Sequence, residues 1–196
     1  MALLNRLSEM PPRRGPANRR RCALGVGLAV LSLCASASAR ADPPLELAVK
    51  ATYLYKLAPF VSWPSAAWSA PDAPLVICVQ GTDPFGPVLD RATAGQAVDS
   101  HPVVVRRLAR LDPAAGCQIA YVAGGAAQSQ AQALQAVAGA PVLTVTDDTQ
   151  HSAAKGIVNL LLEAGRVRFS IDAGQADRNG VAISSKLLAL AVAVKR

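Results

Sequence analysis

Histidine, aromatic residues and paired cysteines are all scarce in this sequence. Only His101 and His151 carry imidazole groups among 196 residues, and no CxxC or histidine–cysteine cluster occurs. Structural zinc sites require such spacings, so we expect no metal site. Beyond the first 41 residues the sequence also lacks a Walker loop, a dinucleotide fingerprint and a Gly-x-Ser-x-Gly elbow. We therefore expect no cofactor and none of the common nucleotide-binding or hydrolase chemistries.

One polar stretch contains the residue types of a catalytic triad. Asp147, Asp148, His151 and Ser152 lie close together in the sequence. An enzyme would need His151 recessed with an acid beside it. Because no nucleophile elbow accompanies these residues, we interpret the stretch as a polar loop after a strand. We predict no catalytic residues and a protein that is not an enzyme.

No apolar run reaches the roughly 20 residues that a membrane span requires. The longest, Ala23 to Ala37, is preceded by six arginines and followed by the small-x-small sites Ala37-Ser38-Ala39 and Ala39-Arg40-Ala41. This order predicts a secretory signal peptide over residues 1–41. An uncleaved N-terminal anchor is the alternative interpretation. We expect residues 42–196 to form a single periplasmic domain that does not span the membrane after cleavage.

Excess positive charge is nearly absent from the predicted mature domain. The whole sequence has a net charge of +7, but residues 42–196 hold 13 Lys or Arg and 12 Asp or Glu, which leaves +1. A nucleic-acid-binding protein needs a basic footprint in its folded domain. We therefore predict no nucleic-acid partner.

Apolar patterns of strand and helix alternate along the predicted domain. Helical spacing follows Pro43-Pro44 and continues to about Val61, and two further helices are expected near residues 83–92 and 129–138. Short apolar runs predict four strands, at residues 75–79, 103–108, 119–122 and 142–145. Such alternation predicts an α/β fold with a mostly parallel sheet covered by helices on both faces.

The C-terminal part follows a different pattern. Residues 157–163 and 166–172 read as strands joined by the two-residue turn Ala164-Gly165, which predicts an antiparallel hairpin. In the second strand, apolar and polar residues alternate, so one face should be buried and the other wet. Ser184-Ser185 then predicts the cap of a final helix that continues to about Val194.

Six short motifs follow one another along the predicted domain. They are Trp63-Pro64, Gly81-Thr82-Asp83-Pro84-Phe85, Leu143-Thr144-Val145-Thr146-Asp147, Gly156-Ile157-Val158-Asn159-Leu160, Arg166-Val167-Arg168-Phe169-Ser170-Ile171-Asp172 and Gly180-Val181-Ala182-Ile183-Ser184-Ser185-Lys186-Leu187-Leu188. In their order and spacing, rather than through any single motif, they resemble the YfiR-like family of periplasmic proteins over about Leu45 to Val194.

The resemblance implies a function in membrane signalling. It implies a periplasmic repressor that binds the outer portion of an inner-membrane diguanylate cyclase, or another membrane sensor, and lowers cyclic-di-GMP synthesis. It also implies capture by an outer-membrane lipoprotein and assembly as a homodimer. The alternative function is a small-ligand sensing domain paired with a membrane sensor, which would need a pocket at the strand ends near Gly81 and Thr146.

Two cysteines remain after the predicted leader, Cys78 and Cys117. An oxidising compartment favours one disulfide between them, and two buried free thiols are the alternative. The pair matches one cysteine pair of the family, whereas a second, more C-terminal pair found in some members is missing here. A doubly wound sheet with its first four strands in the order 2-1-3-4 would bring both residues within bonding range, so we predict that they are joined.

The predicted partner-binding residues are Trp63, Arg166, Arg168 and Ser170. The last three share the polar face of the second hairpin strand, where an ordinary solvated face is the alternative interpretation. The family often has an acidic residue where this chain has Ser170. Trp63 is predicted either to pack against the core or to contact the partner.

Overall fold

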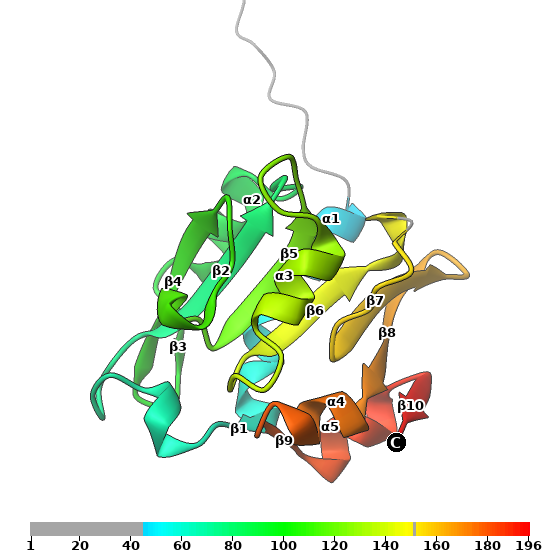
Figure 1. Ribbon diagram of the computed structural model, residues 1–196. Coiled ribbons are helices and arrows are strands. Elements are labelled where there is room, and N and C mark those ends of the chain that lie inside the picture. Colours follow the sequence, from blue (N-terminus) through cyan, green and yellow to red (C-terminus); the bar gives the residue numbers. More distant parts are fainter. Residues whose placement is uncertain (1–44, 151) are drawn as a thin grey trace, which may run out of the picture. The chain divides into compact units, whose positions relative to one another are not determined.

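An eight-stranded sheet forms the centre of the fold (Figure 1). The computed structural model describes residues 45–150 and 152–196, so the predicted signal peptide lies outside the described residues. The strand order is β10-β8-β7-β6-β5-β2-β4-β3. The strands are β2 (Leu75–Gly81), β3 (Ala97–Val98), β4 (His101–Leu108), β5 (Ile119–Gly124), β6 (Leu143–Asp147), β7 (Val158–Glu163), β8 (Arg166–Asp172) and β10 (Ala193–Lys195).

The middle of the sheet is parallel, as predicted. Strands β4, β2, β5, β6 and β7 run in one direction, with Ile77 paired to Val105 on one side and to Ile119 on the other. The first four predicted strands therefore lie in the expected order 2-1-3-4. The α/β fold prediction is confirmed.

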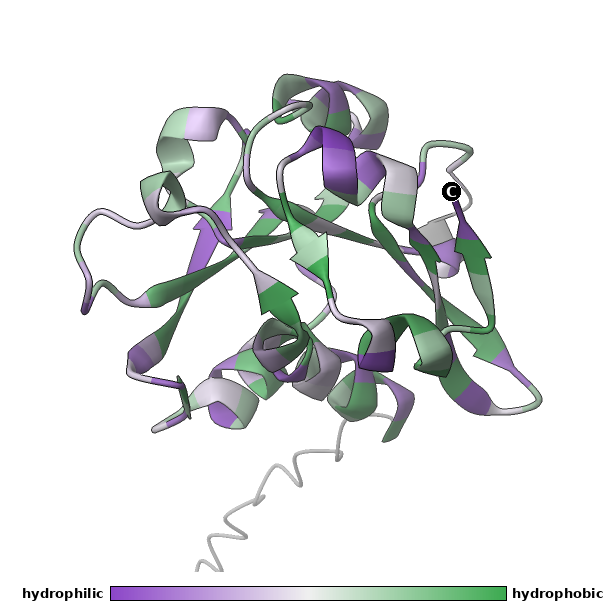
Figure 2. Cartoon of the chain, turned by 90° about the horizontal axis from the view of Figure 1, so that it is seen from below, coloured by the Kyte–Doolittle hydropathy of each residue, from purple (hydrophilic) through white to green (hydrophobic). Residues whose placement is uncertain are grey.

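Side chains on each central strand alternate between two apolar cores. In β2, Ile77 and Val79 face a core that includes α1 (Leu45–Lys56) and α2 (Pro87–Thr93). Val76 and Cys78 face a second core with α3 (Gln130–Ala136). Because both faces are covered, every residue from Leu75 to Gln80 is buried, and Figure 2 shows hydrophobic residues along the strands between the helices.

The predicted disulfide is present in the structure. Cys78 in β2 and Cys117, two residues before β5, are bonded, with their Cα atoms 5.8 Å apart. Both residues belong to the core that packs against α3. The neighbouring positions of β2 and β5 produce this proximity.

The C-terminal hairpin forms as predicted. Ala164 and Gly165 both have positive φ angles, of 49° and 73°, which fits the twist of a two-residue hairpin turn. Strands β7 and β8 pair antiparallel from Glu163–Arg166 through to Val158–Ile171.

The predicted final helix is present, but it ends earlier than the expected limit near Val194. Ser184 caps α5 (Ser185–Leu190) as expected, through its hydroxyl and the N–H of Leu187. The chain then becomes extended, because the N–H of Val192 bonds to the carbonyl of Phe169 and β10 pairs parallel with β8. Val192 and Val194 are β-branched, which favours this extended conformation over a helix.

Besides β3 and β10, the structure contains further short elements that were not predicted from the sequence. They include α4 (Ala173–Arg178) and a separate two-stranded sheet of β1 (Val61–Ser62) and β9 (Ala182–Ile183). Helix α2 also begins later than expected, after Gly86, because Asp83 caps a turn at Phe85 instead of the helix. Across residues 45–150 and 152–196, no helix combines the length and apolarity needed to cross a membrane.

Candidate partner-binding surface

The hairpin strand β8 places three of the four predicted partner-binding residues on one face. Arg166 and Arg168 are exposed and Ser170 is partly exposed, whereas Val167, Phe169 and Ile171 are buried on the other face. The predicted alternation is therefore confirmed, while the binding role of the three polar residues stays a prediction.

Positive charge on this face is only weakly compensated. The Arg168 guanidinium lies 3.8 Å from the Glu163 carboxylate, and both side chains are about half exposed, so this pair contributes little. Arg166 makes no ion pair or side-chain hydrogen bond within the described part of the chain. Both arginines are thus available to another molecule.

The other end of β8 carries a compensated carboxylate. Asp172 accepts hydrogen bonds from the Lys195 ammonium and the Gln175 backbone N–H, at 2.9 and 2.8 Å. Burial opposes ionisation of Asp172, but these two donors outweigh it and hold the pKa of the carboxyl below its ordinary value. Asp172 thereby joins β10 and α4 to the end of β8.

Trp63 lies apart from the arginines. Its indole N–H donates to the Gln118 carbonyl at 3.1 Å, just before β5, and its ring packs edge-on against Trp68 at 6.1 Å. This places Trp63 at the end of the sheet where the parallel strands begin. Arg166 follows β7, at the end of the sheet where the parallel strands finish. The structure therefore does not bring Trp63 together with Arg166 and Arg168.

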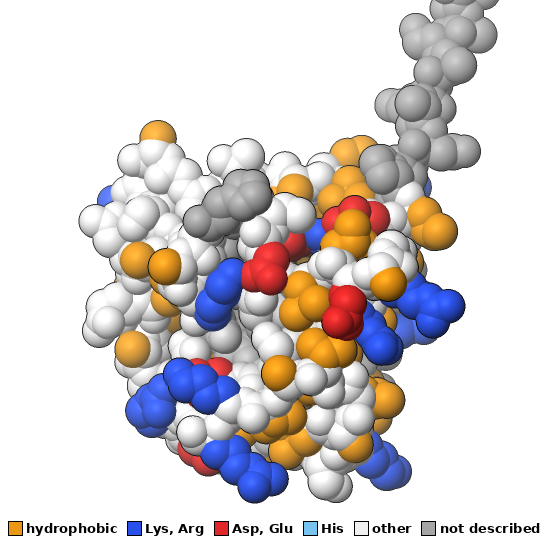
Figure 3. Space-filling model, turned by 90° about the vertical axis from the view of Figure 1, so that its right-hand side faces the viewer, with side chains coloured by type: hydrophobic (Ala, Val, Ile, Leu, Met, Phe, Trp, Pro, Cys, Tyr) orange, Lys and Arg blue, Asp and Glu red, His pale blue; other side chains and the backbone are white. Residues whose placement is uncertain are grey.

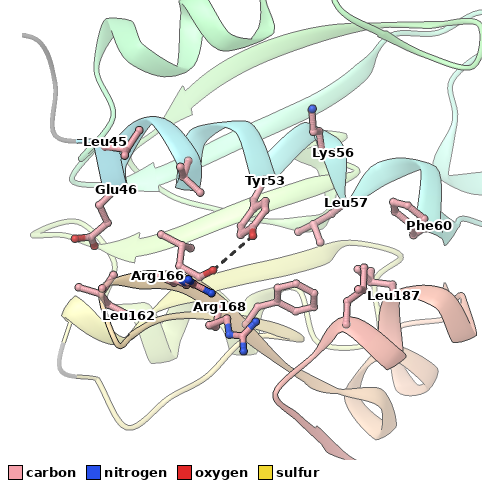
Figure 4. Close-up of a pocket in the computed structure, with 15 residues that line it drawn as sticks. Leu45, Glu46, Tyr53, Lys56, Leu57, Phe60, Leu162, Arg166, Arg168 and Leu187 are labelled. Carbon is pink, nitrogen blue, oxygen red and sulfur yellow. Dashed lines mark hydrogen bonds between the residues drawn. The ribbon is translucent and has the colours of Figure 1, made fainter.

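A groove of about 690 Å³ runs between α1 and β8 and was not predicted from the sequence (Figure 4). Its floor is apolar, formed by residues such as Leu57, Val167 and Phe169. Tyr53 points from α1 toward β8, where its ring meets Phe169 edge-on at 6.1 Å and its hydroxyl donates to the Val167 carbonyl at 3.5 Å. Leu187 of α5 closes one end of the groove.

The rim of the groove combines exposed leucines with basic residues. Leu45, Leu162 and Leu190 are 80%, 50% and 63% exposed. Lys56, Arg166 and Arg168 also line the groove. Hydrophobic and basic side chains lie next to each other on the side of the molecule shown in Figure 3. The sequence held one signal for this groove, because the unbroken run Leu160-Leu161-Leu162 leaves a leucine on the exposed end of a hairpin strand.

A buried ion pair fixes the other side of α1. The Lys50 ammonium lies 2.7 Å from the Asp147 carboxylate and 2.5 Å from that of Glu46. Burial alone would lower the pKa of Lys50, but the hydrogen bonds to Asp147 and Glu46 outweigh it and raise that pKa above its ordinary value. Asp147 also accepts both the N–H and the hydroxyl of Thr149. These contacts tie the start of α1 to the end of β6.

The strand ends proposed for a small ligand are tightly packed. A Cβ atom on Gly81 would lie 2.1 Å from the Gly124 carbonyl oxygen, so the β2 and β5 ends are in backbone contact. Asp83 beside them is held by the Arg107 guanidinium at 2.7 Å. Thr146 is buried and donates to the Asn159 side chain. A smaller hollow of about 220 Å³ lies near Lys50, Phe85 and Asp147.

The polar stretch with triad-like residue types was interpreted as a loop, and the structure describes all of its four residues except His151. His151 lies outside the described residues. Asp147 is held by Lys50 and Thr149, and Asp148 is held by Lys155 and by the Asn159 amide, which together lower the pKa of Asp148. Both carboxylates therefore have structural partners. Among the described residues, no group of three His, Cys, Asp or Glu side chains is arranged to hold a metal.

Fold and surface together define a class: an α/β domain in which apolar and basic side chains are exposed around one groove beside the C-terminal hairpin. A profile of the YfiR/HmsC-like family matches residues 47–192. The chain belongs to the YfiR/HmsC-like family. A comparison with curated proteins finds no match.

Family membership gives the broad role. Proteins of this family are periplasmic and regulatory rather than catalytic, and the family suggests a regulator of diguanylate cyclase signalling.

Proposed function

We propose that this protein is a periplasmic repressor that binds the outer portion of an inner-membrane diguanylate cyclase and lowers cyclic-di-GMP synthesis. The match of the family profile to residues 47–192 carries the proposal, because it covers almost the whole described domain. Export through the signal peptide predicted at residues 1–41 belongs to the same proposal. Capture by an outer-membrane lipoprotein and assembly as a homodimer complete it.

The proposed contact with the cyclase is the polar face of β8. Arg166 and Arg168 are exposed there without strong ion pairs, and Ser170 continues the same face toward β10. The strand itself is held in place by its full pairing with β7. A basic surface of this kind accelerates association with an acidic partner through charge complementarity. We propose Trp63 as a second contact. It is separate from the first, because its partly buried ring lies at the opposite end of the parallel strands.

A regulatory rather than catalytic role is also part of the proposal. Three carboxylates at or near the ends of the parallel strands already have structural partners. Asp147 binds Lys50, and Asp83 and Asp90 both bind Arg107. We therefore propose that the protein acts through the surfaces it presents to a partner.

The experiment is a pull-down with the mature protein, residues 42–196, from solubilised membranes of the source organism. Mass spectrometry of the eluate should identify a membrane diguanylate cyclase. Deletion of the gene should raise cellular cyclic-di-GMP, and expression of the exported protein should restore the original level. A deletion strain with unchanged cyclic-di-GMP, together with an eluate that contains no cyclase, would overturn the proposal.

A further inference from the structure

The helical layer on one face of the sheet ends at α1. Helices α1 and α2 lie against each other on this face and share one apolar core with the strands. Beyond α1 the same face of the sheet continues over β8. Here the groove lies where a covering helix would be expected, and α5 covers only one end of it. Sheet faces in α/β folds are normally covered by helices. This stretch of the face is apolar and has no helix over it in the described part of the chain.

Exposed leucines are concentrated at this groove. Six large hydrophobic residues are exposed among those described, and three of them, Leu45, Leu162 and Leu190, line it. Contiguous exposed apolar side chains around a hollow are typical of a binding surface, whereas isolated ones are ordinary. The groove is therefore suited to bind an apolar surface of another molecule.

The unmatched charge around the groove is positive. Lys56 and Arg166 have no ion pair within the described residues, and Arg168 has only the 3.8 Å contact with Glu163. Glu46, which also lines the groove, lies 2.5 Å from the buried Lys50. Charge complementarity thus favours an occupant with acidic side chains.

The backbone edge of β8 argues against an added strand. Strand β10 pairs with β8 only from Ser170 onward, and the carbonyl of Phe169 is taken by Val192. Alternate residues of the remaining stretch direct their backbone groups toward β7, so only the groups of Val167 and the N–H of Phe169 face outward. The Val167 carbonyl already accepts the Tyr53 hydroxyl. Few backbone groups are thus left for an added strand, which favours recognition through side chains, as in a helix laid into a groove.

We propose that the groove binds an amphipathic helix of about three turns, with its apolar stripe against Leu162, Val167 and Phe169 and acidic residues along its flanks. The length of the proposed helix is taken from α1, which forms one wall of the groove and spans about 18 Å with its 12 residues. The inference rests on the proposed function in one respect: the helix is assigned to the periplasmic part of the membrane cyclase. The chemistry of the groove can be tested separately.

The first test uses a synthetic probe. A fluorescein-labelled 14-residue peptide with leucines at helical spacing and glutamates elsewhere is titrated into the mature protein, and fluorescence anisotropy is recorded. We expect it to bind at least tenfold more tightly than a scrambled peptide or one with lysines in place of glutamates. Equal affinity for all three peptides would overturn the proposal. Displacement of the peptide by phosphatidylglycerol vesicles would also overturn it, if every variant described next lost vesicle binding to the same extent.

The second test uses variants with a matched control. Leu162→Asp and Leu190→Asp alter exposed side chains and should each weaken the peptide complex at least tenfold. Val104→Asp alters another exposed apolar residue, 37% exposed on β4 and outside the groove, and should leave the affinity unchanged. Circular dichroism melting shows whether each variant is folded. Conversion of a dimer to a monomer by Leu162→Asp, seen by light scattering, would identify the groove as an interface between copies and overturn the proposal.

The pull-down separates this inference from the proposed function. Loss of the cyclase with Leu162→Asp but not with Val104→Asp supports both. Equal retention of the cyclase by both variants overturns the groove inference and leaves the proposed function standing. Absence of the cyclase with the unaltered protein, together with selective peptide binding, contradicts the proposed function and still supports the groove as a helix site.

Discussion

Lys50 and Asp147 are each about 3% exposed and are joined to each other across the top of the sheet. A buried charge that loses its partner destabilises a fold by about 3–5 kcal/mol, so removing either Lys50 or Asp147 alone should destabilise this fold. Their contact fixes the first half of α1 against the end of β6. The opposite side of the same helix forms one wall of the groove. At the residue scale, a structural ion pair therefore holds a candidate binding surface in position.

The lowered pKa of Asp172 predicts that its contribution to the free energy of unfolding depends on pH. The variant Asp172→Asn removes the pair with Lys195 but keeps the cap of α4, because asparagine caps helices as well as aspartate. The pKa of Asp172 is lowered in the folded state, so its charge stabilises the fold above the ordinary carboxyl pKa of about 4 and stops doing so as the pH falls through the lowered value. Lys195 is largely exposed, so the difference in unfolding free energy should be no more than about 1 kcal/mol.

The measurement is urea unfolding of both proteins between pH 7 and pH 2. We expect the advantage of the unaltered protein to be full at pH 7 and to disappear toward pH 2. Asp177→Asn, an exposed residue on α4 without a described side-chain contact, serves as the control and should show little change. A difference that stays constant across this range would show that the ionised carboxylate is not its source.

At the scale of elements, the disulfide joins β2 to the segment that enters β5. It closes a loop with a sequence separation of 39 residues that contains α2, β3 and β4. Removing such a cross-link increases the entropy of the unfolded chain and should cost about 4 kcal/mol in the chain-entropy model. We expect Cys78→Ala with Cys117→Ala to lower the urea midpoint by the corresponding amount. Reduced unaltered protein should unfold close to the double variant, and equal midpoints for the oxidised protein and the double variant would contradict the prediction.

Strands that are buried on both faces were predictable because their sequences allow little else. The run Leu75–Val79 is apolar throughout, and the alternation in Arg166–Asp172 fits only a half-buried strand. The C-terminal residues were not predictable in the same way, since Leu187 to Val194 satisfies helical spacing. Contacts between distant residues make β10 a strand, namely the bond from Val192 to Phe169 and the parallel pairing with β8 that follows it.

The candidate surface was predictable in part for the same reason. Alternation along β8 shows which residues face water, so Arg166 and Arg168 were found from the sequence. The groove depends on how far α1 lies from β8 and on where α5 ends, and neither distance is written in a local pattern. Trp63 has the residue type of an interface anchor, but its position depends on the separate β1–β9 pair.

At the scale of the whole molecule, β8 serves two surfaces at once. Its apolar side chains form part of the groove floor on the α1 face, and its arginines lie on the opposite, wet face and reach the groove rim. A partner that contacts both would surround the free edge of the sheet near Arg166. This arrangement separates the roles of the side chains, because the apolar residues support the fold while the arginines are free to change without unfolding it.

Charge reversal at Arg166 and Arg168 tests this division. Arg166→Glu with Arg168→Glu should leave the melting temperature nearly unchanged, since both side chains are exposed and their only described ion pair is weak. Binding to the cyclase should weaken, mainly through slower association, because exposed interface charges steer the encounter. Cellular cyclic-di-GMP should then rise toward the level of the deletion strain. The control Arg91→Glu with Arg106→Glu makes the same change in net charge at exposed positions on α2 and β4, away from the hairpin, and should keep repression. Equal repression by the two double variants would show that this face of β8 is not where the cyclase binds.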